Sequence, residues 1–480
     1  MTSASAADPK RWWALAVIAL AQLMVILDGT IVNIALPSAQ RALGMPDADR
    51  QWVITAYTLA FGGLLLLGGR IADLVGRKRA FVIGLAGFAV ASALGGAAAG
   101  PGTLFAARAL QGAFAAVLAP SALSLLTTTF TDPRERAKAF GVYGALAGGG
   151  SGAGLLVGGL LTEYLNWRWC LYVNVPVALA ALIGAQVFLR DRSGRCGGHL
   201  DVPGVLLGSG GLVALVYGFS EAGPRGWTSP WVAAPLMAGV ILLAAFVWWQ
   251  HRAAGPLLPL RIFRDRSRAG AFATMGLATI GMFGVFLFLT YYFQAVLGYP
   301  PVRTGLAFMP VSVGIVIGAT QIAARLLPRT APHTLMASGM VLAAAGMVLL
   351  SRLTVHAQYV PHVLPGLLLV GLGMGLTFMP VYATATVGVP TQDTGAASAA
   401  LTTVQQIGAS LGTVLLNTIA TGATSRHCRA DSGTALAEAM VHGFSVAYWC
   451  SAGVLLLAAL VAALTVRRGK PSQAGSKPSA

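Results

Sequence analysis

Long apolar runs dominate the sequence, and each is close to the roughly 20 residues that a helix needs to cross a bilayer. Charged residues make up only 10% of the 480 residues, whereas a soluble domain carries about 25%. The chain is therefore predicted to be an all-α integral membrane protein with about fourteen transmembrane helices. The predicted spans are Trp12–Leu36, Trp52–Gly68, Ala80–Ala98, Leu104–Thr127, Ala139–Leu161, Trp169–Leu189, Val202–Phe219, Trp231–Trp249, Ala269–Tyr292, Thr304–Leu326, Thr334–Leu350, Pro361–Ala385, Ala396–Ala420 and Val441–Val466.

The order of these spans predicts two six-helix bundles with two extra helices between them. The predicted parts are a cytoplasmic N-terminus (1–11), a first bundle (12–189), a linker with the two extra helices (190–268), a second bundle (269–466) and a disordered cytoplasmic tail (467–480). GGRIADLVGRKRAF, at 68–81, and ARLLPRTAPHTL, at 324–335, occupy equivalent places in the two bundles. Parallel repeats of this kind build large secondary transporters, whose substrate sites lie between the halves.

The net charge of +17 is distributed unevenly over the predicted loops. With both termini in the cytoplasm, most of the 32 Lys and Arg residues fall on the cytoplasmic side, as the positive-inside rule requires. The charge therefore indicates a multi-pass protein of the cytoplasmic membrane and not a nucleic-acid binder. Lys10 and Arg11 precede an apolar run that is too long for a signal peptide and has no cleavage site, which predicts a retained first helix.

One acidic residue, Asp28, lies deep inside a predicted span. A carboxylate at the bilayer centre costs roughly 2.5 kcal/mol or more, so such residues usually face a cavity and carry function. The other fourteen acidic residues fall in predicted loops or at the ends of spans. Asp28 is therefore the leading candidate for a site that binds a proton or a cation.

The fourth span contains a basic residue, Arg108, at the start of RALQGAFAA. A buried guanidinium needs a partner or water. The string resembles the fourth-helix motif of the major facilitator superfamily, and this resemblance implies that Arg108 is a second candidate for proton coupling. Because Arg108 lies only about five residues into the span, the alternative is that its side chain extends to the membrane surface.

Two further patterns concern helix packing. In the inner loop after the second span, Gly69 and Gly76 permit close approach. The charged residues Asp73, Arg70, Arg77 and Lys78 predict a network that holds the cytoplasmic ends of helices together. An ordinary basic loop is the alternative. The fifth span carries glycines that would form a flat helix face, against which a partner helix can move, or a generic packing surface. These glycines are Gly141, Gly150, Gly154, Gly158 and Gly159.

Together these strings resemble the fourteen-helix drug:proton antiporters of the major facilitator superfamily. The first-helix motif LDGTIVNIALP (27–37) matches throughout, and WRWCLYVNVP (167–176), YYFQAVLGYPPVRTGLAFMP (291–310) and QQIGASLG (405–412) are also similar. The resemblance covers essentially the whole chain and implies the major facilitator fold, a cytoplasmic gate in the inner loop and an antiporter motif in the fifth span. Three residues depart from the motifs, namely Leu74 for a basic residue, Phe114 for glycine and Leu155 for proline.

The combined pattern predicts proton-coupled efflux of amphiphilic organic compounds, such as drugs, dyes or antibiotics, driven by the proton motive force. The candidate substrate contacts are Asn33, Gln294, Gln405 and Gln406, each of which can equally be an interhelical hydrogen bond. The alternatives are a proton symporter that imports a nutrient, and a membrane sensor or scaffold that transports nothing. The sequence has no P-loop, no metal-ligand spacing and no paired carboxylates, so we expect a monomeric transporter without a cofactor, a metal or an enzymatic activity.

Overall fold

All regular secondary structure in the described residues is helical, as expected for a backbone that must satisfy its own hydrogen bonds in lipid. The computed structural model describes residues 11–47, 49–130, 132–189, 201–253, 256–257, 260–327, 329–386, 394–430 and 436–466, and none of these is in a strand. The predicted tail, 467–480, and all but one residue of the predicted N-terminal segment lie outside the described residues.

The predicted spans coincide with helices. Twelve helical segments of the described chain are long and apolar enough to cross a membrane. The other two predicted spans are occupied by α2 (Trp52–Val75) and α5 (Pro133–Tyr164). The all-α membrane fold is therefore confirmed.

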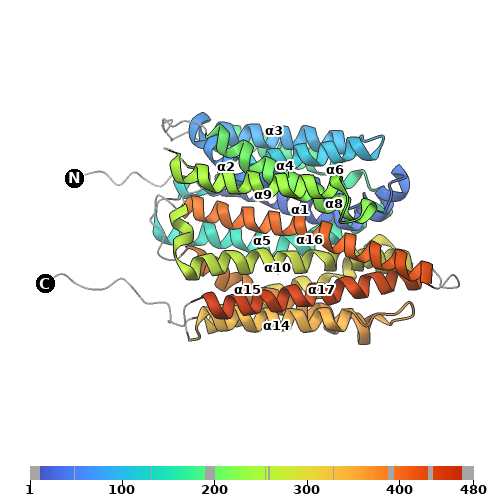
Figure 1. Ribbon diagram of the computed structural model, residues 1–480. Coiled ribbons are helices and arrows are strands. Elements are labelled where there is room, and N and C mark those ends of the chain that lie inside the picture. Colours follow the sequence, from blue (N-terminus) through green and yellow to red (C-terminus); the bar gives the residue numbers. More distant parts are fainter. Residues whose placement is uncertain are drawn as a thin grey trace, which may run out of the picture. The chain divides into compact units, whose positions relative to one another are not determined.

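Two compact units can be distinguished from the contacts within the chain. Unit 1 holds the described residues of Met1–Gly218, Ala233–Leu258 and Tyr299–Leu306, and unit 2 holds the remainder. The helices that lie wholly or mainly in unit 1 are α1 (Arg11–Leu43), α2, α3 (Arg77–Gly96), α4 (Pro101–Thr129), α5, α6 (Trp169–Tyr172), α7 (Asn174–Phe188), α8 (Val202–Arg225), α9 (Pro230–Arg252) and α11 (Pro301–Ala307) (Figure 1).

Small residues allow the helices of unit 1 to approach closely. Helix α4 packs along both α2 and α3, and α1 packs along α5. A Cβ atom on Gly68 would collide with the Ala116 carbonyl, and one on Gly112 would collide with the Tyr57 carbonyl. Glycine at both positions thus brings the backbones of α2 and α4 together, as is common in membrane bundles. This close approach places the Val53 carbonyl within reach of Arg108.

The two extra helices, α8 and α9, also have specific polar contacts. Ser209 on α8 donates a hydrogen bond to the Gly63 carbonyl of α2 over 2.9 Å. Asp201, just before α8, accepts hydrogen bonds from Trp249 Nε1 at 2.6 Å and Gln250 Nε2 at 2.7 Å. The side chain of Asp201 therefore fastens the start of α8 to the end of α9.

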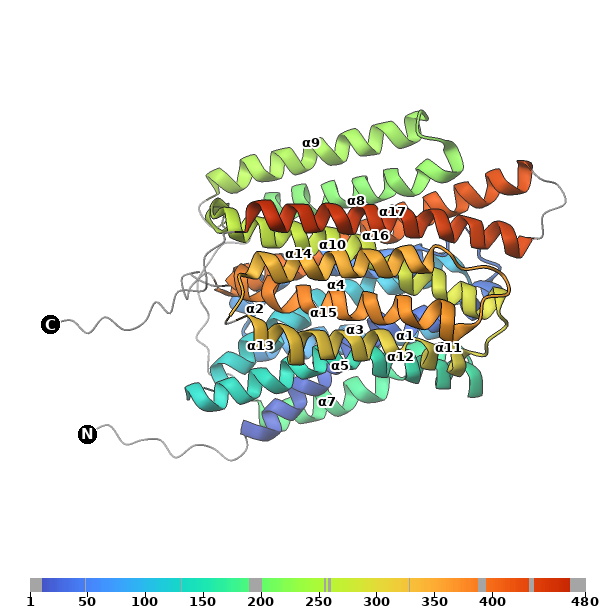
Figure 2. The ribbon, with the colours of Figure 1, turned by 90° about the horizontal axis from the view of Figure 1, so that it is seen from below.

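Unit 2 contains the remaining helices, several of which lie side by side (Figure 2). Helix α15 packs on α12 and α14, while α10, α16 and α17 contact one another. Three π-helical turns interrupt this unit, and such turns are rare and often occur near functional regions. The elements are the 3₁₀ helix η1 (Leu260–Arg264), α10 (Arg266–Tyr291), the π turn η2 (Tyr292–Val296), α12 (Met309–Ile317), the π turn η3 (Gly318–Ala323), α13 (Ala324–Leu326), α14 (Pro332–Leu350), the π turn η4 (Tyr359–Val363), α15 (Leu364–Thr386), α16 (Thr394–Ala430) and α17 (Leu436–Thr465).

Candidate functional site

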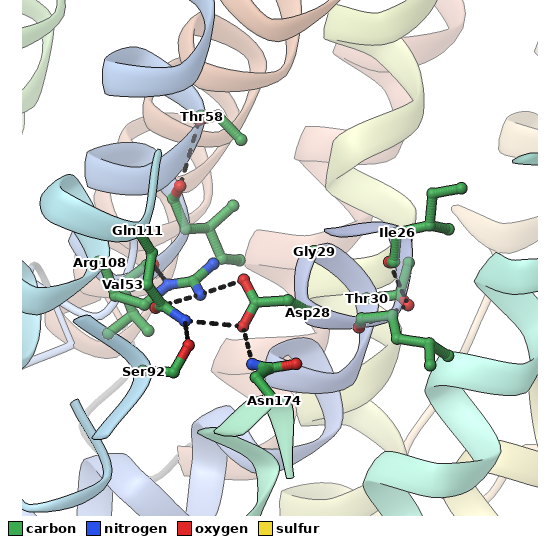
Figure 3. A network of polar contacts seen from close by, with 12 residues as sticks. Ile26, Asp28, Gly29, Thr30, Val53, Thr58, Ser92, Arg108, Gln111 and Asn174 are labelled. Carbon is green, nitrogen blue, oxygen red and sulfur yellow. Dashed lines mark hydrogen bonds and ion pairs between the residues drawn. The ribbon is translucent and has the colours of Figure 1, made fainter. Parts of the chain in front are cut away.

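Asp28 lies at the centre of a buried polar cluster in unit 1 (Figure 3). Its side chain is fully buried, and both carboxylate oxygens accept hydrogen bonds. Oδ2 accepts from Arg108 Nη1 at 2.6 Å, and Oδ1 accepts from Gln111 Nε2 at 3.0 Å and from Asn174 Nδ2 at 2.8 Å. The predicted deep carboxylate is thus held by three N–H donors from two other helices, α4 and α7.

Arg108 points into this cluster and does not extend to a membrane surface. It is only 1% exposed, and besides its ion pair with Asp28 it donates from Nε to the Val53 carbonyl over 3.0 Å. Its Nη1 also donates to Gln111 Oε1 over 2.9 Å. The guanidinium lies 4.4 Å from the ring centroid of Tyr57, a distance at which an aromatic face attracts a cation. Arg108 is therefore compensated by a carboxylate, two neutral oxygens and an aromatic ring.

Two residues of the cluster did not emerge from the sequence as site residues. Ser92, on α3, accepts a hydrogen bond from Gln111 Nε2 over 2.7 Å, and Asn174 is the first residue of α7. Both are buried. Asn174 belongs to the string WRWCLYVNVP and lies a few residues into the predicted span Trp169–Leu189, and a polar amide in that apolar run is a signal that could have identified it. Ser92 gives no such signal, because serine is a common packing residue in membrane helices.

The cluster has no acceptor positioned for a proton on Asp28. Every hydrogen bond described at its carboxylate comes from an N–H donor. A proton on either oxygen would face one of these donors, so protonation requires at least one of them to turn or move away. The nearby Tyr57 hydroxyl is buried without a hydrogen-bond partner. A buried hydroxyl without a partner has lost its hydrogen bonds to water, which costs free energy in this arrangement. Any rearrangement that gives the hydroxyl a partner would recover part of that free energy.

The predicted glycine face of α5 contacts the opposite side of α1. A Cβ atom on Gly150 would lie 3.0 Å from Ile26 Cγ2, one on Gly158 would lie 2.7 Å from the Ile31 carbonyl oxygen, and one on Gly154 would collide with Thr30 Oγ1. Gly141 also lies in α5, but its surroundings are outside what the structure describes. The partner of this face is therefore the helix that carries Asp28.

The last glycine of the pattern, Gly159, has a different partner, α11. A Cβ atom on Gly159 would lie 2.7 Å from the Pro301 carbonyl oxygen, and one on Gly305 would lie 2.6 Å from the Leu155 carbonyl oxygen. Glu163, near the end of α5, accepts a hydrogen bond from the Val302 N–H over 2.8 Å. The two helices are thus joined by reciprocal glycine contacts and one carboxylate contact.

The predicted gate residues lie at the junction of α2 and α3. Gly76 has φ +102°, a left-handed conformation that favours glycine, and it separates the two helices. Gly69 lies in α2 near Pro120 of α4, and Lys78 donates to the Gln186 carbonyl over 3.3 Å. Arg77 is the first residue of α3. The side chain of Asp73 is outside the described part of the structure, so the charge network remains a prediction.

The four candidate substrate contacts are divided between the units. Asn33 is buried in unit 1, where Nδ2 donates to the Gly29 and Thr30 carbonyls of its own helix and Oδ1 has no hydrogen-bond partner. Gln294 lies in η2, and Gln405 and Gln406 lie in α16, all in unit 2. Gln405 Oε1 accepts from the Tyr382 hydroxyl over 3.3 Å. A role in substrate binding remains a prediction for all four.

Comparison with known proteins places these features in a family. The sequence profile of the Major Facilitator Superfamily matches residues 18–413. The chain belongs to the Major Facilitator Superfamily. The puromycin resistance protein pur8 of Streptomyces alboniger is 57% identical over 95% of this chain and 91% of that protein. The cephamycin export protein CmcT of Amycolatopsis lactamdurans is 39% identical over 86% of this chain and 85% of that protein.

The structure also resembles solved structures of transporters. A bacterial homologue of the human lysosomal transporter Spinster aligns with a TM-score of 0.69 over 97% of this chain and 100% of that chain, at 17% identity. At that identity the likeness supports the fold alone. The predicted major facilitator fold and membership are therefore confirmed, and the chain is a multi-pass membrane protein.

Two departures from the superfamily motifs have structural explanations in this facilitator. Phe114 stands where the fourth-helix motif has glycine, and its ring occupies the space that a Cβ atom on Gly87 would need. Leu155 stands where the antiporter motif has proline, and α5 is one helix from Pro133 to Tyr164 with a fully buried Leu155. Gly305 packs against the Leu155 backbone, so the close contact with α11 does not need proline.

Proposed function

We propose that this facilitator exports amphiphilic organic compounds, such as drugs, dyes or antibiotics, in exchange for protons that move inward. The observation that supports this most is the buried Asp28–Arg108 ion pair, whose carboxylate is surrounded only by donors. The names of the relatives, which include a puromycin resistance protein and a cephamycin export protein, favour export of antibiotics.

Proton binding at Asp28 would change the contacts of five helices at once. The negative carboxylate holds Arg108 and Gln111 of α4 and Asn174 of α7, while those residues reach α2 and α3 through Val53 and Ser92. Neutralising the carboxylate removes the ion pair and forces a donor to turn away. Protonation is thereby linked to rearrangement of the bundle, which is what coupling of a proton to alternating access requires.

One proton is enough to drive the proposed export. At a membrane potential of about 150 mV, one inward proton supplies roughly 3.5 kcal/mol. This supports a concentration ratio of roughly 300 for a neutral substrate, before any pH difference is added. For exchange of one proton against one monovalent cation no net charge moves, so only the pH difference contributes.

The proposed transporter has a defined orientation in the membrane and defined moving parts. The positive-inside distribution places both termini in the cytoplasm and the chain in the cytoplasmic membrane. Some of Asn33, Gln294, Gln405 and Gln406 would contact the substrate, and the predicted bundles, 12–189 and 269–466, would move to open and close the substrate path. The gate residues Gly69, Asp73, Gly76, Arg77 and Lys78 would close its cytoplasmic side.

Liposomes with an acidic interior test the proposal independently of the orientation in which the protein inserts. Proteoliposomes loaded at low pH and diluted into buffer two pH units higher receive labelled puromycin, and uptake by protein-free liposomes is subtracted. An antiporter exchanges outgoing protons for puromycin and accumulates it, up to about 100-fold for one proton per neutral molecule. Asp28→Asn should lose this accumulation, whereas Asp47→Asn, which changes an exposed carboxylate, should retain it.

The other functions give different results in the same assay. A proton symporter would expel the substrate together with the protons, and a sensor or scaffold would give no flux above protein-free liposomes. Either result refutes export by antiport. Full accumulation by Asp28→Asn would leave export intact but remove Asp28 from proton coupling.

A further inference from the structure

A small cavity lies beside the Asp28–Arg108 pair within unit 1. Its volume is about 10 Å³, and Arg108 forms part of its wall. On α1 it is lined by Val32, Ala35, Leu36 and Ala39. These residues follow Asp28 by 4, 7, 8 and 11 positions, so they lie on the same face of the helix as the carboxylate.

The other walls place the cavity on one particular side of the cluster. Leu104 precedes Arg108 by one turn of α4, and Trp167 and Cys170 precede Asn174 in the chain. The cavity therefore lies between the polar cluster and the end of unit 1 where α1 finishes and α4 begins. With both termini in the cytoplasm, this end faces the outside, from which protons would arrive.

The chemistry of the lining controls whether water can occupy this cavity. Its volume is near the lower limit for one water molecule, and water needs two to four polar partners to stay in a buried site. Apart from Arg108 the lining is almost wholly apolar side chains. Hydrophobic constrictions of this kind close channels by excluding water, and a fixed positive charge repels protons. In the described arrangement the apolar lining and the guanidinium therefore both oppose the entry of protons into the cavity.

We propose that this cavity is a hydrophobic gate through which water and protons from outside reach Asp28. Its ligand is a water molecule or hydronium ion, admitted only when the surrounding helices separate and Arg108 moves. The gate prevents protons from binding Asp28 at the wrong stage, which would dissipate the proton gradient without export. This inference rests on the proposed proton coupling at Asp28.

Two substitutions change the gate in opposite directions. Val32→Thr keeps the shape of a buried side chain but adds a hydroxyl that can hold water. It should raise the substrate-independent proton flux about fivefold, the effect of one hydrogen bond on a barrier. Ala35→Leu fills the space and should lower pH-driven accumulation about tenfold. Exchange of labelled for unlabelled puromycin without a pH difference needs no net proton movement and should be unchanged by Ala35→Leu.

Matched controls lie on lipid-facing surfaces of the same unit. Val90→Thr on α3 and Ala16→Leu on α1 make the same chemical changes at exposed positions. Proton flux is measured with a pH-sensitive dye inside the proteoliposomes. Accumulation and exchange of the substrate are measured with labelled puromycin. Because Val32→Thr changes little volume, it provides the proton-flux test even if Ala35→Leu fails to fold.

The same measurements distinguish a wrong gate from a wrong proposed function. If wild type accumulates puromycin while Val32→Thr and Ala35→Leu both behave like their controls, the gate is wrong and export by antiport stands. If Ala35→Leu slows exchange as much as pH-driven accumulation, the cavity serves the substrate or the fold, and the gate is again wrong. If wild type itself shows no pH-driven accumulation, the proposed function fails, and this inference fails with it.

Discussion

The ion pair between Asp28 and Arg108 predicts how the stability of the bundle responds when one partner is removed. Arg108→Met keeps an unbranched side chain but removes the donor 2.6 Å from Asp28 Oδ2 and the donor 3.0 Å from the Val53 carbonyl. Asp28, which is fully buried, is left without its counter-ion. Removing one partner of a buried pair typically costs about 3–5 kcal/mol of unfolding free energy, because the remaining charge is uncompensated.

Removing both partners should be less harmful than this single change. In Asp28→Asn/Arg108→Met no charge remains in the cluster, and replacing a whole buried pair by neutral residues is often tolerated. The double variant should therefore be more stable than Arg108→Met alone. This order requires a coupling energy between the two sites that exceeds the cost of Asp28→Asn, itself about 3–5 kcal/mol because it leaves Arg108 uncompensated. Arg303→Met is the control, because the exposed Arg303 lies over the Tyr299 ring and its loss should cost about 1 kcal/mol or less.

Equilibrium unfolding in mixed detergent micelles measures these differences, with the free energy taken from the loss of helical circular dichroism. The expected order of stability is wild type, then the double variant, then Arg108→Met. If the double variant loses the sum of the two single losses, the residues act independently. The structural basis for coupling Asp28 protonation to helix movement would then be wrong.

Two further predictions concern α5. Gly154→Leu should abolish puromycin export from cells, because the leucine side chain would displace Thr30 of α1. Gly453→Leu is the control, because the space beside Gly453 is open and the substitution should be tolerated. Equal export by both variants, at equal amounts of protein in the membrane, would contradict the contact between Gly154 and Thr30. A disulfide between Leu156→Cys and Gly305→Cys should stop export until it is reduced, since a Cβ atom on Gly305 would lie 3.3 Å from Leu156 Cα. Export by the oxidised double variant at the level of the single variants would show that α5 and α11 need not separate.

The fold was largely predictable because the bilayer imposes one rule on every span. A run of about 20 apolar residues has to be a helix, so fourteen spans could be placed approximately from composition alone. The interruptions were not predictable in this way. The predicted span Thr304–Leu326 is divided into α11, α12, the π turn η3 and α13, and neither hydropathy nor helix propensity distinguishes a π turn from an α turn.

The site was predictable residue by residue but not as an arrangement. Asp28 and Arg108 were each conspicuous because a charge in an apolar run is costly, yet they are 80 residues apart in the chain. Their pairing depends on the rotation of α1 and α4 about their axes, which is set by glycine contacts such as Gly112 against Tyr57. Asn174 completes the cluster from 146 residues away, and the cost of one amide in an apolar run is too small to indicate a partner.

The position of α1 explains why protonation of a single residue can affect distant contacts. Ile26 and Thr30 face α5, and Asp28, two residues from each, points about 200° away into the polar cluster. One side of α1 is thus held by an ion pair and hydrogen bonds. The other side contacts glycines of α5, which have no side chains that could interlock with α1. When the polar contacts loosen, α1 meets little resistance to sliding on α5, whose last glycine contacts α11. Under the proposed coupling, a change of one charge at Asp28 would therefore reach the Tyr299–Leu306 segment, which is joined in the chain at both ends to residues of unit 2.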